Sequence, residues 1–294
     1  MRKILVILTV ASIVGAAVAN GKINRRKLGI YQSNVPETET LAEETMEFVY
    51  DYSYCVDTTG ELTDNYSSDN MLLQISSDGV SKFSSFKNLT VDSILMSSTP
   101  EQISAAVMEG KLSNGEFMTI YKNYPTGKLT HTEKICQDWF SYEEDMPVLD
   151  WELTDTLVDV LGYECHGAKC SFRGREWTAF YTEDIPIMEG PWKLHGLPGL
   201  IMKASDEKGE YTFECIGIKS SANRPITIYK APFNKTDRKG YYDTKNRYEI
   251  NPYAYFEATT GGHITVTDQA GNPLPDAYEP EELPFDYIER DWRK

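Results

Sequence analysis

The sequence of 294 residues has few basic residues for its length, and it has only four histidines. Its 29 lysines and arginines are outnumbered by 45 aspartates and glutamates, so the formal net charge is −16 at pH 7. Nucleic acids and anionic membrane surfaces bind through clustered lysine and arginine. The charge therefore argues against nucleic acid and against an anionic lipid surface as partners.

The sequence also lacks the short motifs of the common chemistries. It contains no Gly-x-Ser-x-Gly elbow, no His-Glu-x-x-His pair, no Walker loop and no dinucleotide fingerprint. No CxxC pair occurs, and Cys165 and Cys170, five apart on a predicted strand, point to opposite faces, which disfavours a metal site. Runs of acids such as Glu143–Asp145 are typical of a solvated surface. We therefore predict no metal ion, no cofactor and no catalytic residue.

Only one long apolar run is present, and it lies at the beginning of the chain. Arg2 and Lys3 precede it, and Ala17–Ala19 has the small-x-small pattern of a cleavage site. The run is short for a membrane span and no second one follows, so we expect no transmembrane segment in the mature chain. Residues 1–19 are predicted to be a cleaved signal peptide. Because no cysteine follows Ala19 directly, we expect a periplasmic or extracellular protein that is not a lipoprotein.

Cysteine is scarce but not absent. In an oxidising compartment, an odd number of cysteines predicts at least one disulfide and at least one free thiol. The pairing stays open among the five residues Cys55, Cys136, Cys165, Cys170 and Cys215.

What is abundant is hydrophobic and aromatic sequence, at 40% and 12% of the residues, which indicates a folded core. After a polar N-terminal arm at 20–45, the aromatic residues at 48, 50, 52 and 54 alternate with other side chains, as in a strand. Asp78-Gly79 between strand-like flanks predicts a hairpin with a type I′ turn over 71–83. Further strands are predicted at 116–123, 128–135, 147–153, 154–160, 163–172, 175–182, 199–205 and 210–219, and helices at 100–109 and 235–248.

Short turns between neighbouring strands favour antiparallel pairing, since parallel pairs need long crossovers. We therefore predict a mainly β protein: one long curved antiparallel sheet, an open half-barrel similar to periplasmic lipoprotein carriers, with one or two packed helices. The predicted domain spans 46–220. Residues 221–294 form a C-terminal extension, part helix and part acidic, Pro-rich loop.

One region carries a more specific pattern. Phe172–Arg175 and Trp177–Thr182 are followed by Gly190–Lys193 and by the six residues Gly196–Ile201, Gly-Leu-Pro-Gly-Leu-Ile. This pattern resembles the GLPGLI family of secreted proteins of Gram-negative bacteria. Gly162-Tyr163-x-Cys165 and the Ser-x-Phe-x-Ser segment at 81–85 are similar to two further elements of that family. The resemblance covers about 46–220 and implies no reaction, cofactor or catalytic residue; Gly167, Cys170 and Cys215 depart from the family pattern.

The motif admits two interpretations, and the sequence leaves both open. In the structural one, its glycines and prolines shape a turn that tucks apolar side chains under the sheet, Gly199 holds a positive φ, and Gly199→Val destabilises the fold. His195 and Lys193 then lie outside the core, so replacing either with alanine costs about 0.5 kcal/mol or less. In the functional one, the segment is the lip of a ligand groove. The residues concerned are Arg173, Arg175, Trp192, Lys193, Gly196, Leu197, Pro198 and Gly199, with Arg173, Arg175 and Lys193 as anion contacts.

Three functions are compatible with the sequence. The first is a non-enzymatic secreted or periplasmic protein that binds an apolar or glycan ligand, or an outer-membrane partner; its many tyrosines can stack on a ligand while offering a polar tip. The second is a hydrolase with an unrecognised carboxylate or histidine site. The third is a structural assembly factor of the envelope. Catalysis predicts at least two titratable groups with perturbed pKa values in one cleft, whereas binding does not require them.

Overall fold

The structure is a computed structural model, and most of the chain can be described. Most of the predicted signal peptide, half of the polar arm, His263 and most of the Pro-rich loop lie outside the described residues. The described residues are 18–19, 22–23, 35–60, 65–108, 112, 114–220, 224–262, 279–280 and 282–293.

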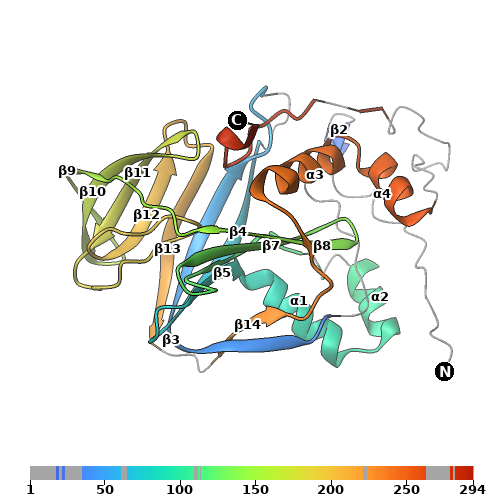
Figure 1. Cartoon of the computed structure of the whole chain (residues 1–294), viewed down its shortest axis with the longest axis horizontal. Helices are drawn as coiled ribbons and strands as arrows, with labels where there is room; N and C mark the ends of the chain where they lie inside the picture. The colour runs from blue at the N-terminus through green and yellow to red at the C-terminus, as the bar shows by residue number, and fades with distance from the viewer. Residues whose placement is uncertain are drawn as a thin grey trace.

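A single open sheet forms the body of the protein (Figure 1). Its strands are β3 (Thr38–Cys55), β4 (Tyr66–Ser76), β5 (Ser81–Ser85), β6 (Thr119–Lys122), β7 (Lys128–Ile135), β8 (Asp138–Asp145), β9 (Glu152–Val160), β10 (Tyr163–Phe172), β11 (Arg175–Thr182), β12 (Leu200–Asp206), β13 (Tyr211–Ser220), β14 (Pro225–Tyr229) and β15 (Asn234–Lys235). These 13 strands follow the order β15-β8-β7-β6-β5-β4-β3-β13-β12-β11-β10-β9, with β14 on β3 beside that path. Within the described sheet only the β15–β8 contact is parallel. The predicted mainly β fold with a long, open antiparallel sheet is confirmed.

The helices lie at one end of the sheet (Figure 1). They are α1 (Phe86–Ser97), α2 (Pro100–Met108), α3 (Arg238–Ile250), α4 (Pro252–Thr260) and a short 3-10 turn (Asp291–Arg293), while β1 (Val18–Ala19) and β2 (Lys22–Ile23) form a separate pair. The helices predicted at 100–109 and 235–248 correspond to α2 and α3. Helix α1, which was not predicted, is capped by Ser85, whose side chain accepts a hydrogen bond from the Asn88 N–H. Among the described helices, none is long and apolar enough to cross a membrane.

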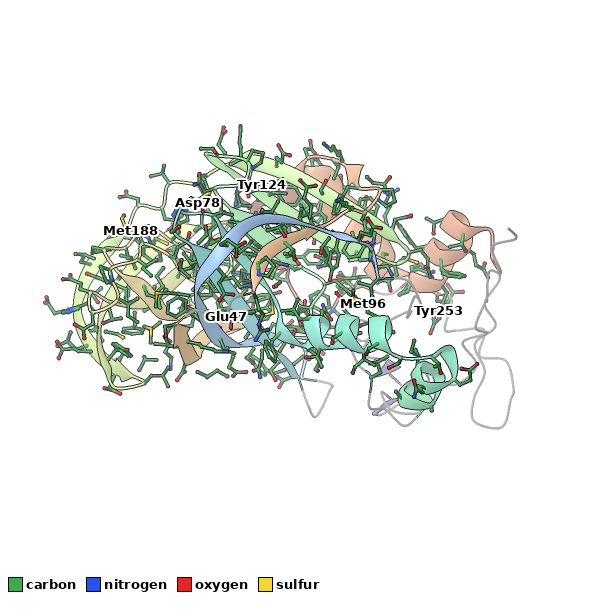
Figure 2. The ribbon with its side chains drawn as sticks, turned by 90° about the horizontal axis from the view of Figure 1, so that it is seen from below. Glu47, Asp78, Met96, Tyr124, Met188 and Tyr253 are labelled. Atoms are coloured by element: carbon green, nitrogen blue, oxygen red, sulfur yellow. The ribbon has the colours of Figure 1, made fainter. Side chains whose placement is uncertain are left out.

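Strand β3 organises the core. Phe48, Tyr50, Tyr52 and Tyr54 are all buried, as their alternation predicted, and they form one wall of the main hydrophobic cluster. The Tyr52 ring stacks on Phe213 of β13 with centroids 4.8 Å apart. Figure 2 shows β3 as a curved blue ribbon with Glu47 labelled beside it. The curvature gives the sheet a concave face, and the aromatic wall lies on it.

Some elements differ from the sequence-based expectation. Strand β3 begins at Thr38 rather than Met46, because β14 pairs with its first part and supplies hydrogen-bond partners from far along the chain. Of the two strands expected at 147–153 and 154–160, the structure has the single strand β9 over Glu152–Val160, and residues 147–151 are not in a strand. Strand β8 was not expected, because its residues are mostly polar. In the hairpin turn Gly79 has φ 82° but Asp78 has no positive φ, so the turn is not type I′.

The predicted disulfide is not formed in this structure. All five cysteines have free thiols, and four of them are buried. They lie on β3, β10 and β13 or in the β7–β8 turn, where they pack as small apolar side chains. Burial raises the pKa of Cys136, Cys165 and Cys215 to about 11, which keeps these thiols protonated.

Gly199 is required by close packing and not by a positive φ, so the expected reason was wrong. Its φ lies outside the left-handed region, which Gly196 occupies with φ 92°. A Cβ on Gly199 would lie 2.1 Å from the backbone oxygen of Thr182, which is far inside van der Waals contact. Only glycine lets the beginning of β12 approach the end of β11 this closely.

We therefore expect Gly199→Ala to lower the free energy of unfolding by about 1–3 kcal/mol, because even one methyl group overpacks the site. Gly217→Ala is the matched control, since a Cβ there meets only Val49 at an ordinary 3.8 Å. Urea denaturation of both variants measures the difference. Equal stability of the two variants would contradict the close-packing explanation.

Candidate functional site

The Gly196–Ile201 motif belongs to a loop that fills the concave face. Lys122 of β6, which is fully buried, donates a hydrogen bond of 2.7 Å to the Gly190 carbonyl and pairs with Glu189. The Tyr50 hydroxyl donates to the Ile201 carbonyl at 2.8 Å. Trp192 is fully buried 5.5 Å from Trp177. The loop is thus part of the core, as the structural interpretation proposed.

Lys193 is the centre of a buried ion network, which contradicts the expectation that it lies outside the core. Its side chain is fully buried, pairs with Glu289 at 2.8 Å and with Glu144 of β8, and donates to the Tyr142 hydroxyl at 3.0 Å. Arg173 joins by pairing with Glu144. Together with Arg238 and Asp291, which extend the network from Glu289, three cations meet three carboxylates, so the cluster carries no net charge.

Arg175 forms a second buried network. It pairs with Asp206 at 2.5 Å and Glu210 at 2.8 Å, and it donates to the Tyr287 and Ile288 carbonyls at 2.8 and 3.1 Å. Its guanidinium lies 4.5 Å from the centroid of the Tyr211 ring. Every side of this cation is therefore occupied by the protein itself.

The three residues that were predicted to contact an anion are engaged inside the protein. Arg173, Arg175 and Lys193 all pair with carboxylates of the chain and hold the segment 286–291 against the motif loop. The sequence placed this segment in a separate extension, but its Glu289 is fully buried in the main body.

A chain of hydrogen bonds leads from Lys193 across the end of the sheet. Lys193 can only donate, so the Tyr142 hydroxyl accepts from it and donates to Nδ1 of His131 at 3.2 Å. His131 therefore carries its proton on Nε2, 3.4 Å from Glu133. Glu133 in turn pairs with Lys245 of α3 at 2.7 Å. Because the Glu133 carboxylate can only accept, it requires the same assignment, with Nε2 of His131 as the donor.

The pKa shifts along this series of hydrogen bonds show which of its groups are charged at pH 7. Burial raises the pKa of Glu133, but Lys245 and His131 outweigh it and bring the pKa down to about 2. Burial lowers the pKa of His131, and Glu133 only partly offsets this, so the imidazole is neutral at pH 7. At pH 7 Glu133 is thus a carboxylate and His131 a neutral donor. Both nitrogens of His131 and both oxygens of Glu133 have partners inside the protein.

Beside this chain lies a pocket, which we call the tyrosine pocket. Six tyrosines contribute to its wall together with His131, Glu133, Lys245, Glu116 and Glu249. The tyrosines come from β3, β13, α3 and the C-terminal segment, and are Tyr52, Tyr211, Tyr241, Tyr242, Tyr248 and Tyr287. The space open to the centre of a water molecule is about 90 Å³, room for about six waters at about 15 Å³ each. Aromatic faces with polar tips and charged groups are typical of a site for a polar ligand that has a ring.

A break in the sheet makes room for this pocket. Residues 114–118, directly before β6, lie between β5 and β7 but form no strand pairing. Side chains supply the hydrogen bonds that neighbouring strands would otherwise make. The Asn88 amide accepts from the Gly115 N–H and donates to the Glu116 carbonyl, and Asp69 accepts from the Glu116 N–H at 2.8 Å. Gly115 is needed there, because a Cβ would lie 2.1 Å from the Ser85 hydroxyl.

This pocket was not predicted from the sequence. All eight residues named for the motif are described, and none of them lines it. Its histidine and carboxylates are ordinary polar positions of β7, α3 and the segment before β6, and no short motif joins them. The abundance of tyrosine was the one signal that pointed to an aromatic-lined site. Within the described ranges, no cluster of three or more His, Cys, Asp or Glu side chains could hold a metal ion.

Comparison with protein families gives one match. A family described as "Protein of unknown function (Porph_ging)" matches residues 166–203. These residues run from β10 into β12 and include Arg173, Arg175, Lys193 and the Gly196–Ile201 motif. No curated protein matches the chain. The matched region is therefore the part of the fold that holds the ion networks.

Among solved structures, the chain is similar to PNGF-II in two crystal forms. The form in space group C2 has a TM-score of 0.46 and 15% identity, with 68% of this chain and 32% of that chain covered. The form in space group P21 has a TM-score of 0.49 and 14% identity, with 71% and 34% covered. The chain thus spans about a third of the length of the PNGF-II chains that it matches.

We expect Lys193→Met to lower the free energy of unfolding by about 3–5 kcal/mol, because it leaves buried carboxylates without their central cation. Lys203→Met is the matched control: Lys203 pairs with Glu214, but their side chains are 41% and 50% exposed. That control should cost about 1 kcal/mol or less. Urea denaturation at pH 7 distinguishes the two, and a loss below about 1 kcal/mol for Lys193→Met would refute its central role.

His195 supplies a prediction about pH. Burial, together with nearby Lys122, lowers the pKa of His195 to about 4, from an ordinary value of 6.5. Between pH 6.5 and 4 the unfolded chain binds a proton that the folded chain does not, so stability falls as the pH falls through this window. His195→Gln should remove this contribution, roughly 1–3 kcal/mol at pH 4. Denaturation curves for parent and variant from pH 7 to 4 measure it; a difference between them that stays constant with pH would rule it out.

Proposed function

We propose that the protein is a non-enzymatic binding protein and that its ligand is a neutral sugar unit held in the tyrosine pocket. The observation that carries the proposal is the convergence of six tyrosines with Lys245, Glu116 and Glu249 on one pocket. Tyrosine rings stack on the apolar face of a sugar ring, while hydroxyl, carboxylate and ammonium groups bind its hydroxyls.

The pairing of the titratable groups supports binding over hydrolysis. Titratable groups with perturbed pKa values do converge here, which the hydrolase hypothesis requires. However, Glu133 pairs with Lys245 and hydrogen-bonds to His131 and Tyr241, and with a pKa of about 2 it has no proton to donate at pH 7. His131 has no ring nitrogen left for a substrate. A general acid or base must reach the reacting group, and neither residue is available for that.

The wider assignment is part of the same proposal. Removal of residues 1–19 would deliver the protein to the periplasm or beyond, where glycans are accessible. Membership of the GLPGLI family is supported by the Gly196–Ile201 motif and by the family match over 166–203. An outer-membrane partner would then be a second route by which the protein acts in the envelope.

The test is binding of neutral mono- and disaccharides, screened at millimolar concentration by saturation-transfer NMR and quantified by calorimetry. For the sugars that bind, we expect Tyr248→Ala to weaken binding about tenfold, because it removes one ring of the pocket wall. Tyr163→Ala is the control, since Tyr163 is also half-buried but lies on β10, away from the pocket. Either no binding of any sugar, or an equal effect of the two variants, would reject the proposal.

A further inference from the structure

A second cavity lies across the sheet from the tyrosine pocket. It is enclosed by α1 and by β5, β7, β8 and β14, and the space open to a water centre is about 80 Å³. Phe117 and Lys134 border both cavities, at the break in the sheet between β5 and β7. We call it the α1 cavity. The residues that line it differ from those of the tyrosine pocket, since two lysines and a buried serine face it.

The α1 cavity holds more positive charge than the protein neutralises. Lys82 is 5% exposed, and its one hydrogen bond goes to the Thr227 carbonyl at 2.9 Å. Lys134 is half-buried. Neither lysine forms an ion pair with a described residue. The one carboxylate that lines the cavity is Asp92, which accepts a hydrogen bond from the Tyr229 hydroxyl.

The lowered pKa values of both lysines reflect the cost of burying this positive charge. Burial lowers the pKa of Lys82 to about 8, with only a partial offset from Asp92. Burial also lowers the pKa of Lys134, although Cys136, Asp92 and Asp138 oppose the shift. Buried ammonium groups of this kind are stabilised when an anion enters beside them. In a protein with a net charge of −16, such a local surplus of positive charge is unusual.

A second, independent feature is the Ser84 hydroxyl. Ser84 is 5% exposed, faces the α1 cavity, and its Oγ has no hydrogen-bond partner among the described residues. The neighbouring Asn88 amide is already engaged by Gly115 and Glu116, so it does not satisfy this group. A buried hydroxyl that forms no hydrogen bond destabilises the fold, and a ligand oxygen would accept a hydrogen bond from it.

Apolar side chains form part of the remaining wall, beside polar residues such as Asn114 and Thr119. Leu89, Val91 and Leu95 of α1, together with Phe117 and Trp139, line the cavity. A ligand that fills it therefore needs an apolar body as well as an anionic group. Two lysines against one carboxylate leave one positive charge to be balanced, which matches a monoanion better than a dianionic phosphate.

We propose that the α1 cavity binds a small organic carboxylate with an apolar body, which pairs with Lys82 and Lys134 and accepts a hydrogen bond from Ser84. This site adjoins the tyrosine pocket at Phe117 and Lys134, but the proposal does not depend on the proposed sugar ligand. The volume limits the body to about the size of a single ring or a short alkyl chain.

Calorimetry with benzoate and with octanoate tests the proposal. Benzyl alcohol serves as the neutral analogue and inorganic phosphate as the other anion. We expect at least one of the two carboxylates to bind at millimolar concentration or tighter, and benzyl alcohol and phosphate to bind at least about tenfold more weakly. No binding by either carboxylate, or equal binding of phosphate, would overturn the proposal.

Variants locate the binding. Lys134→Met should weaken binding of the carboxylate about tenfold, whereas Lys128→Met, on the same strand but 45% exposed, should leave it unchanged. Ser84→Ala should weaken binding severalfold, and Tyr248→Ala in the tyrosine pocket should have no effect. Lys134 is half-buried, so this variant keeps the test valid even if Lys82→Met fails to fold. Carboxylate binding that is equally strong in Lys134→Met and Lys128→Met would also overturn the proposal.

Discussion

The contact between Lys193 and Glu289 is the constraint on which the rest of the structure depends. Both side chains are fully buried, and the contact joins the motif loop to a segment almost a hundred residues further along the chain. Burial raises the pKa of Glu289, but Lys193 and Arg173 outweigh it and bring the pKa to about 2. A buried charge is tolerated only beside its partner, so neither segment can adopt this structure without the other.

Lys193 also sets hydrogen-bond directions beside the neighbouring pocket, through the Tyr142 hydroxyl. Because Lys193 occupies the Tyr142 hydroxyl as a donor, Tyr142 must donate to His131, and His131 must donate to Glu133. At pH 7, two groups of the pocket wall, His131 and Glu133, therefore have a charge and a hydrogen-bond direction that their partners inside the protein set. Such a wall presents an unchanging pattern to a ligand, which suits recognition.

What the sequence could predict was what local patterns encode. The alternating aromatic residues of β3, the hairpin at Gly79 and the strands β10 and β11 follow from period-two patterning and turn residues, and they were predicted correctly. The role of Lys193 was not, because its partners lie on β8 and in the C-terminal segment, and no local pattern records them. Strand β8, which is mostly polar, was not predicted for a related reason. Its buried residues are covered by α3 and the C-terminal segment, which lie far along the chain.

The break at 114–118 shows how an interruption of regular structure creates space. A paired strand there would carry side chains alternately to the two faces and close both cavities. Instead, Asn88 and Asp69 satisfy the backbone of Gly115 and Glu116, which removes the cost of leaving the ladder. The backbone can then pass between β5 and β7 without filling the sheet, and Phe117 borders the cavities of both faces. The two cavities therefore have one structural cause, although the groups that line them select different ligands.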